Sequence, residues 1–199
     1  MVGASSSSSS IPAAAFVALI VSIALAASIG PVAAQTYTGN PILLYDDPFA
    51  IWSAGQNSYC TASGSKITCL GVTNIAQATP FAVGGGCGGV PYSQGFLTSL
   101  YVWNQVQGNT WCYTYPTLAQ DPSQNLWCNA AKGADALQFQ LRNWDPASDG
   151  YIHINASQVR IRAKYSQWCS AQPATNNGGF MQCDRTSTSG WESFSFVPV

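Results

Sequence analysis

Charged residues are scarce in this sequence: aspartate, glutamate, lysine and arginine together make up 8% of the chain. Seven basic residues stand against eight acidic ones and the net charge is −1, so nucleic acid is not an expected partner. Glutamate occurs once, at Glu192, and several aspartates lie in turn segments, where they favour local hydrogen bonds. Because glycoside hydrolysis needs two positioned carboxyl groups, no enzyme activity is expected.

Histidine is almost absent as well, since His153 is the only one in the chain. A zinc site needs converging ligands, and no Cys-x-x-Cys motif accompanies His153, so neither a metal nor another cofactor is expected. A Ser-His-Asp site lacks its Gly-x-Ser-x-Gly motif. His153 alternates with Ile152 and Ile154 and is expected on a strand surface, while Glu192 is expected to partner an arginine such as Arg185.

Long apolar runs are missing except near the N-terminus. Residues 11–27 are almost wholly apolar, and the small residues 32–34 suit cleavage before Gln35. This pattern predicts a secretory signal peptide over residues 1–34, although no Lys or Arg precedes the apolar run. A signal anchor is the alternative. After cleavage no membrane span is expected, and the protein should be secreted, either free or associated with a cell wall or surface.

Amphipathic helices are also not indicated, because β-branched, aromatic and turn residues dominate residues 35–199. The clearest unit is residues 159–199. Its first strand should have an apolar face and a basic face, the basic one formed by Arg160, Arg162 and Lys164. A turn is expected at residues 176–179, because asparagine and glycine adopt positive φ with little strain. A hairpin partner strand and a final aromatic strand should follow it.

This unit occurs three times, in residues 40–84, 92–142 and 150–199. Each copy has an aromatic-Cys step, a second Cys, and a Phe 11 or 12 residues later. The aromatic-Cys steps are Tyr59-Cys60, Trp111-Cys112 and Trp168-Cys169; the second cysteines are Cys69, Cys128 and Cys183; the closing residues are Phe81, Phe139 and Phe194. Three such copies cannot bury their apolar faces singly, so residues 35–199 are expected to form one all-β domain, a β-trefoil, with a sandwich as the alternative.

The cysteines pair naturally within the copies. A secreted chain favours three hairpin bridges, Cys60 to Cys69, Cys112 to Cys128 and Cys169 to Cys183, although sequence alone leaves the connectivity open. Cys87 is left over in the glycine-rich segment GGGCGGV. It either joins a disulfide-linked partner chain or has no role.

The third copy resembles a known family. Its ending, DRTSTSGWESFSFV, looks like the closing motif of fascin-like, actin-crosslinking-type β-trefoil repeats, and VRIRAKYSQWCSA is similar to their opening. The match covers about 40 residues, is weak in the other two copies, and lacks the glycine of the opening turn. The resemblance implies the trefoil fold. It implies actin bundling only for cytosolic members, whereas trefoils of secreted proteins are associated with carbohydrate binding.

Aromatic residues supply the candidate binding surface, because sugar C–H faces stack on rings. They are densest in the second copy, at Trp111, Tyr113, Tyr115 and Trp127. Trp111, Trp168 and Trp191 also suit a packing layer. The basic face is a second candidate, suited to sulfated or uronic polysaccharide, with a solvated strand face as the plain alternative. The expected partners are therefore polysaccharides or the glycans of glycoproteins.

Two further readings stay open. The sequon Asn155-Ala156-Ser157 predicts N-glycosylation of Asn155 at a surface loop. A secreted inhibitor of proteases or other hydrolases is an alternative function, and outside the third copy its reactive-loop lysine would be Lys66 or Lys132. A structural component of an extracellular matrix, joined through Cys87, is another.

Overall fold

The computed structural model describes residues 41–91, 97–131, 139–143, 150–155, 158–164 and 167–199. The expected signal peptide, Lys132 and Ser157 lie outside the described residues. Thirteen strands are assigned in the described part: β1 Phe49–Ser53, β2 Ser58–Tyr59, β3 Thr61–Ser63, β4 Lys66–Thr68, β5 Phe81–Gly84, β6 Ser99–Val102, β7 Thr110–Tyr113, β8 Trp127–Ala130, β9 Phe139–Asn143, β10 Val159–Ala163, β11 Trp168–Ser170, β12 Gln182–Arg185 and β13 Phe194–Pro198. The helical segments among these residues are three short 3-10 turns, so the all-β prediction is confirmed.

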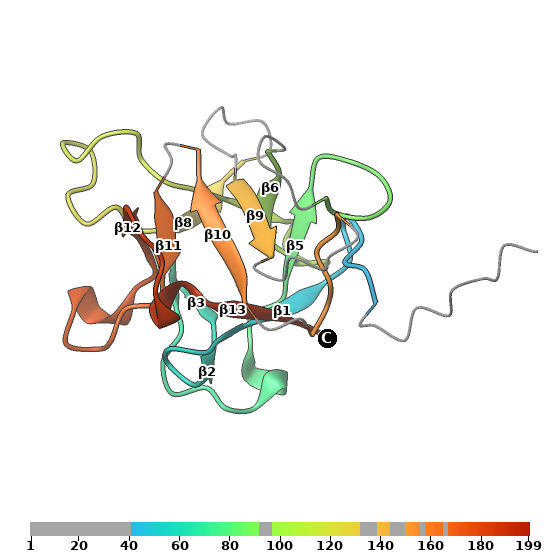
Figure 1. The fold of residues 1–199 in the computed structure, drawn as a ribbon, viewed down its shortest axis with the longest axis horizontal. Coiled ribbons are helices and arrows are strands. Elements are labelled where there is room, and N and C mark those ends of the chain that lie inside the picture. The colour runs from blue at the N-terminus through green and yellow to red at the C-terminus, as the bar shows by residue number, and fades with distance from the viewer. Residues whose placement is uncertain (1–40, 92–96, 132–138, 144–149, 156–157, 165–166) are drawn as a thin grey trace, which may run out of the picture. The chain divides into compact units, whose positions relative to one another are not determined.

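Six of the strands close into a barrel. Antiparallel pairings join β13 to β1, β5 to β6 and β9 to β10, which links each copy to the next. Within each copy the first strand meets the last at one point: Phe49 with Phe81, Thr98 with Phe139, and Val159 with Phe194. These pairings close the sheet into a ring, and the fold is a β-trefoil with threefold pseudosymmetry. Figure 1 shows two of these wall strands, β13 and β1, running below β10 and β9 in the view.

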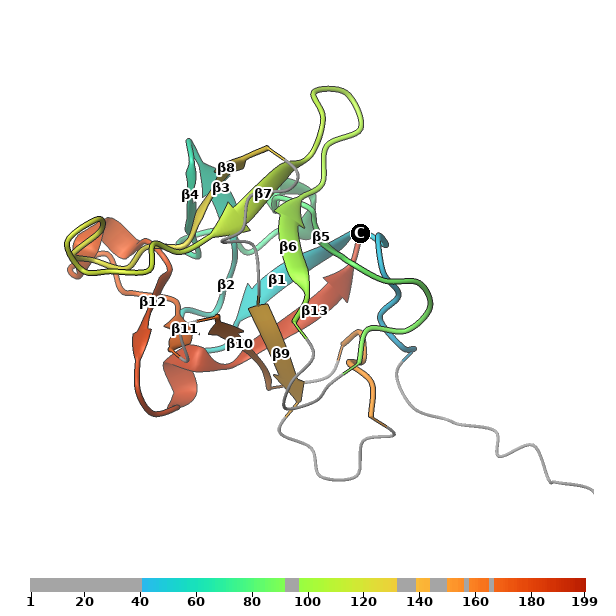
Figure 2. The ribbon, with the colours of Figure 1, turned by 90° about the horizontal axis from the view of Figure 1, so that it is seen from above.

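The remaining strands form hairpins that cap the barrel. β3 pairs with β4, β7 with β8, and β11 with β12. Each cap carries one disulfide, and the connectivity is the expected one: Cys60–Cys69, Cys112–Cys128 and Cys169–Cys183. Neighbouring caps also pair, because Lys66 in β4 lies opposite Trp127 in β8. Figure 2 shows β3, β4, β7 and β8 gathered together on one side of the molecule.

Equivalent residues of the three copies meet at both ends of the barrel axis. At the cap end Met181 donates its N–H to the carbonyl of Ile67, and Leu126 donates to the carbonyl of Met181. At the other end three short segments close a ring, in which Leu43 donates to Ile152, Ile152 to Val90 and Val90 to Leu43, over 2.8 to 2.9 Å. All six side chains are fully buried. The sequence analysis did not anticipate this second ring.

The core follows the repeat. Phe81, Phe139 and Phe194 are at most 1% exposed, as are the middle residues of the opening strands, Ile51, Leu100 and Ile161. The expected position of His153 is wrong: it is 4% exposed and forms a β-bridge opposite Ile42 rather than lying on the surface. The segment at residues 151–154 closes the bottom of the barrel, so both of its faces are covered. In the described residues no helix is long and apolar enough to cross a membrane.

Candidate functional site

A cluster of rings lies where the second cap meets its neighbours. We call it the cap patch: Lys66, Tyr113, Tyr115, Trp127 and Phe180. Tyr113 and Tyr115 meet edge to face with ring centroids 5.4 Å apart, and Tyr115 meets Trp127 in the same way at 6.1 Å. All five side chains are half-buried, so each keeps part of its surface in solvent. The structure therefore brings together three of the four aromatic residues that the sequence singled out.

A lysine and a phenylalanine from the other two copies complete the patch. The Nζ atom of Lys66 lies 4.6 Å from the centroid of Trp127 and 4.8 Å from that of Phe180. Such cation–π contacts are expected because β4 and β8 pair directly and because Phe180 forms a bridge with Thr68. Lys66 is thus held against two rings, which is not the presentation of a reactive-loop lysine on an exposed loop.

The indole of Trp127 is fixed in orientation by a buried carboxylate. Its Nε1–H donates to Asp121 Oδ2 over 2.8 Å, and Asp121 also accepts the backbone N–H groups of Asn125 and Ser123. Burial alone would raise the pKa of Asp121, but these hydrogen bonds outweigh it and lower the pKa, so the group is ionised at neutral pH. A fixed indole offers a preorganised platform rather than a mobile side chain.

The two tyrosines supply polar edges beside this platform. The hydroxyl group of Tyr113 donates to that of Tyr115 over 3.5 Å. Burial, followed by this hydrogen bond and by the charges of Tyr115 and Asp121, raises the pKa of Tyr113 to about 12. The hydroxyl group of Tyr113 is therefore neutral at physiological pH, and it can donate or accept hydrogen bonds.

Trp111 does not belong to the cap patch. It lies opposite Tyr101 in the pairing of β6 with β7, with ring centroids 4.7 Å apart, and its ring covers Gly84, where an added Cβ would come within 2.9 Å. The hydroxyl group of Tyr101 donates to Asp46 over 2.8 Å. Trp111 therefore packs on the barrel wall, as its alternative reading proposed. Trp191, expected to pack, is 41% exposed.

The basic face has fewer exposed residues than the alternation of residues 159–164 predicted. Val159, Ile161 and Ala163 are buried as expected, but Arg160 is also buried, at 9% exposure, and donates to Thr188. Glu192 lies near Arg160 and opposes the lowering of its pKa by burial. The loop before η3 (Gly190–Glu192) covers this position, so Arg160 is not part of an exposed surface. Lys164 is exposed and Arg162 is half-buried.

Arg162 lies instead beside an arginine that the sequence analysis did not single out. Its guanidinium carbon is 5.3 Å from the centroid of Trp168, and that of Arg142 in β9 is 5.4 Å from the same ring. The nearest signal in the sequence was the alternation of Phe139 and Leu141 with polar residues. It gives no indication that β9 pairs with β10, because that depends on the closure of the barrel.

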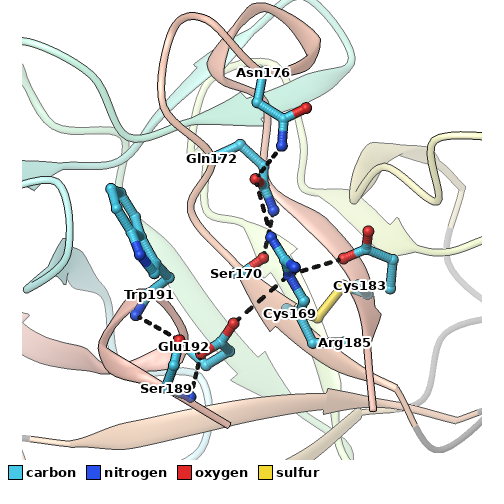
Figure 3. Close-up of polar contacts among 10 residues, drawn as sticks. Cys169, Ser170, Gln172, Asn176, Cys183, Arg185, Ser189, Trp191 and Glu192 are labelled. Carbon is cyan, nitrogen blue, oxygen red and sulfur yellow. Dashed lines mark hydrogen bonds and ion pairs between the residues drawn. A yellow bond between two sulfur atoms is a disulfide. The ribbon is translucent and has the colours of Figure 1, made fainter. Parts of the chain in front are cut away.

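Glu192 is held in a polar network of the third copy, drawn in Figure 3. It accepts the backbone N–H and the hydroxyl group of Ser189, which forms a capping box for η3, and it lies 3.8 Å from Arg185 Nε. Arg185 also reaches Asp184 at 3.5 Å and donates to Gln172. The expected Glu192–Arg185 pair is confirmed, and the segment WESF contributes Glu192 to this local network.

Asn155 and Cys87 lie in surface segments. Asn155 has a φ of 62°, its side chain is exposed, and it borders an open groove of about 350 Å³ that is lined by Trp52, Tyr59, Thr73, Asn155, Ser195 and Val197. Cys87 is a free, exposed cysteine. A second open groove, of about 540 Å³, lies between the first two copies, and Trp103 and Val106 are among its lining residues.

Comparison with known proteins identifies relatives by fold alone. No family model matches this sequence, and no curated protein does. Among solved structures, the receptor binding domain of botulinum neurotoxin D matches with a TM-score of 0.57 and 10% identity, over 80% of this chain and 44% of that one. The SDF2-like protein from Arabidopsis thaliana matches with a TM-score of 0.55 and 10% identity, over 78% of this chain and 94% of that one.

Lysenin, solved in complex with phosphocholine, matches with a TM-score of 0.53 and 12% identity, over 81% of this chain and 47% of that one. The present chain thus spans less than half the length of the neurotoxin domain and of lysenin. Identities this low establish a shared fold and no shared activity. What this chain is similar to is a set of β-trefoil domains, and the similarity does not single out the fascin-like family.

Proposed function

We propose that this chain is a secreted, non-catalytic, carbohydrate-binding module, and that the cap patch is its binding surface. The observation that carries the proposal is the convergence of Tyr113, Tyr115 and Trp127 into one half-exposed cluster, with the indole held by Asp121. Partly exposed rings offer stacking surface for the C–H faces of a sugar, and the two tyrosine hydroxyl groups offer hydrogen bonds to its hydroxyl groups.

Secretion is the second part of this proposal. Three disulfides are typical of proteins that mature in an oxidising compartment, and the apolar N-terminal run suits a signal peptide over residues 1–34. The exposed side chain of Asn155 suits N-glycosylation of its sequon. The third-copy resemblance to fascin-like repeats is retained as a proposed relationship. The partners proposed are polysaccharides or glycoprotein glycans at a cell wall, matrix or cell surface.

A glycan array and a pull-down with insoluble polysaccharides test this function, using the secreted protein and a Trp127→Ala/Tyr115→Ala variant. We expect saturable binding that falls on the order of tenfold or more when the rings are removed, taking as a guide the ~1–3 kcal/mol that a nucleobase gains by stacking on an aromatic side chain. Trp191→Ala is the matched control, because Trp191 is an exposed tryptophan outside the cap patch. Unchanged binding in the double variant, with its fold retained, would refute the proposed site.

Two other roles would move ahead if no glycan bound. One is a secreted hydrolase or protease inhibitor. The other is a structural matrix component that forms an intermolecular disulfide through the exposed Cys87. Non-reducing gel electrophoresis of material secreted by the native source separates the second role, since a covalent partner would disappear in a Cys87→Ser variant.

A further inference from the structure

Three equivalent pairs of side chains stand on the outer wall of the barrel, one in each copy. The first strand of each copy contributes one residue and the following strand contributes the aromatic residue that precedes the cysteine. These pairs are Trp52 with Tyr59, Tyr101 with Trp111, and Arg162 with Trp168. The first two pairs are neutral rings in contact at 4.7 Å. The third copy has a cation in place of a ring.

A third position strengthens this difference. Arg142 lies opposite Arg160 in the pairing of β9 with β10, and the equivalent positions are Val197 opposite Ala50 and Gly84 opposite Ser99. At the position equivalent to Arg142, the barrel wall therefore has a valine in the third copy and a glycine in the first. Folding does not require a positive charge here, yet Arg142 of the second copy and Arg162 of the third both lie against Trp168.

Within the part of the chain that the structure describes, these two charges have no acidic partner. Among the described residues the ion pairs involve Arg185, and neither Arg142 nor Arg162 forms one. The side chain of Arg142 donates to Gln140 over 3.4 Å, and the Nε atoms of Arg142 and Arg162 are shielded from solvent without a hydrogen-bond acceptor. Burial, followed by the charge of Arg162, lowers the pKa of Arg142. Two guanidinium groups therefore lie against one tryptophan ring, at an electrostatic cost.

From this pair, we infer that Arg142 and Arg162 form an anion subsite that binds a sulfate ester or carboxylate group of an acidic polysaccharide. An oxyanion that contacts the partly exposed guanidinium groups would offset the repulsion between them. Arginine is the residue best suited to this contact, because its planar fork of donors matches the oxygens of sulfate and carboxylate. Trp168 holds both guanidinium groups in place and is a positioning residue.

This inference deepens the proposed carbohydrate-binding function by naming a class of glycan, and it rests on that function. It uses a different surface from the cap patch, however, because its residues belong to β9, β10 and β11 rather than to β4, β7 and β8. It also revises the expected basic face: Arg142 contributes to the partly exposed positive charge beside Arg162, whereas Arg160 is buried and does not.

Binding of soluble polymers to the secreted full-length protein tests the subsite. The probes are dextran sulfate, polygalacturonate and neutral dextran, measured by isothermal titration calorimetry with an Arg142→Gln/Arg162→Gln variant. We expect the wild-type protein to bind at least one acidic polymer and not neutral dextran. Removing two charge-assisted contacts should weaken this binding by on the order of tenfold or more. Which acidic polymer binds distinguishes the sulfate ester from the carboxylate.

Arg185→Gln is the matched control, because it removes one positive charge from an arginine that already faces Asp184 and Glu192. An equal loss in this control would mean that net charge alone drives binding, and would overturn the inference. So would unchanged affinity in the folded double arginine variant, or wild-type protein that binds none of the acidic polymers. The Trp127→Ala/Tyr115→Ala variant separates the two proposals, since it should retain the acidic contact even if the cap patch binds nothing.

Discussion

The inside and the outside of this trefoil follow the threefold repeat to different degrees. Inside, each copy closes with a buried phenylalanine, and the residues that meet at the cap end of the axis are Ile67, Leu126 and Met181, similar in size and polarity. Outside, the equivalent wall positions hold Trp52, Tyr101 and Arg162. Equivalent backbone positions therefore carry interchangeable side chains in the core and chemically distinct ones on the wall.

This difference teaches where to look for function. Close packing limits the core to apolar residues of about the right volume, so three copies of one unit stay alike there. The outer wall has no such limit, and its departures from symmetry concentrate chemistry where neighbouring copies meet. The cap patch is centred on the second copy, and the arginine pair lies where the second copy meets the third. Four experiments test whether this division holds, from the largest expected effect to the smallest.

The largest effect is expected inside the barrel. Phe139→Ala should lower the free energy of unfolding by about 3–5 kcal/mol, because it leaves a cavity at a fully buried position. Urea denaturation followed by tryptophan fluorescence measures this. Met181→Leu, which copies the second-copy residue into the third, should cost less than about 1.5 kcal/mol. If both substitutions had the same effect, the copies would not be interchangeable inside.

Removal of a cap disulfide should have the next largest effect. The bridge between Cys112 and Cys128 closes a loop with a sequence separation of 16, for which the entropic model gives about 3 kcal/mol. Denaturation of a Cys112→Ala/Cys128→Ala variant measures this loss. Cys87→Ser is the control from outside the repeat, and should change stability by no more than about 0.5 kcal/mol because Cys87 is exposed. A comparable loss in the control would show that Cys87 has a structural role.

Asp121 is intermediate between the core and the outer wall, because it is buried like a core residue but occurs only in the second copy. Asp121→Asn should cost about 1–2 kcal/mol at neutral pH, because charge-assisted hydrogen bonds to Trp127 and to two backbone groups are weakened. Since the pKa of Asp121 is lowered in the folded state, its contribution is present above the unfolded pKa and is lost as the pH falls through the folded pKa. The difference between wild type and variant should therefore shrink on acidification. Urea midpoints from neutral pH to about pH 2 check this, and a constant difference would contradict it.

The smallest effect is expected on the outer wall. Arg162→Gln should leave the free energy of unfolding within about 0.5 kcal/mol of wild type, because it removes one of two unpaired like charges. Thermal and urea denaturation at low ionic strength measure the change. A loss greater than about 1 kcal/mol would mean that the arginine pair stabilises the fold, contrary to the inside–outside division.

Much of this fold was predictable from local pattern. The alternation over residues 159–163 predicted a strand with a buried apolar face, and the turn at residues 176–179 was expected from its asparagines and glycines, three of which have positive φ. The aromatic-Cys steps indicated which strands carry the caps. Such signals are readable because each depends on residues that are close together in the chain.

The candidate site was predictable only in part. Tyr113, Tyr115 and Trp127 were found because they lie in one copy, whereas Lys66 and Phe180 come from the first and third copies. Arg142 was missed for the same reason, because it meets Arg162 only through the pairing of β9 with β10. Arg160 was misplaced on the surface, since strand alternation cannot show that a later loop covers one residue of the polar face.

The sequence by itself determined the threefold repeat and the strand character of its parts, because these follow from side-chain periodicity and short spacing. It favoured pairing of cysteines within each copy but left the connectivity open until the structure showed the three bridges. Only the tertiary structure decided the ring of Leu43, Val90 and Ile152, the cap patch and the arginine pair. Each of these joins different copies, and such contacts form only when the barrel closes and brings distant strands into register.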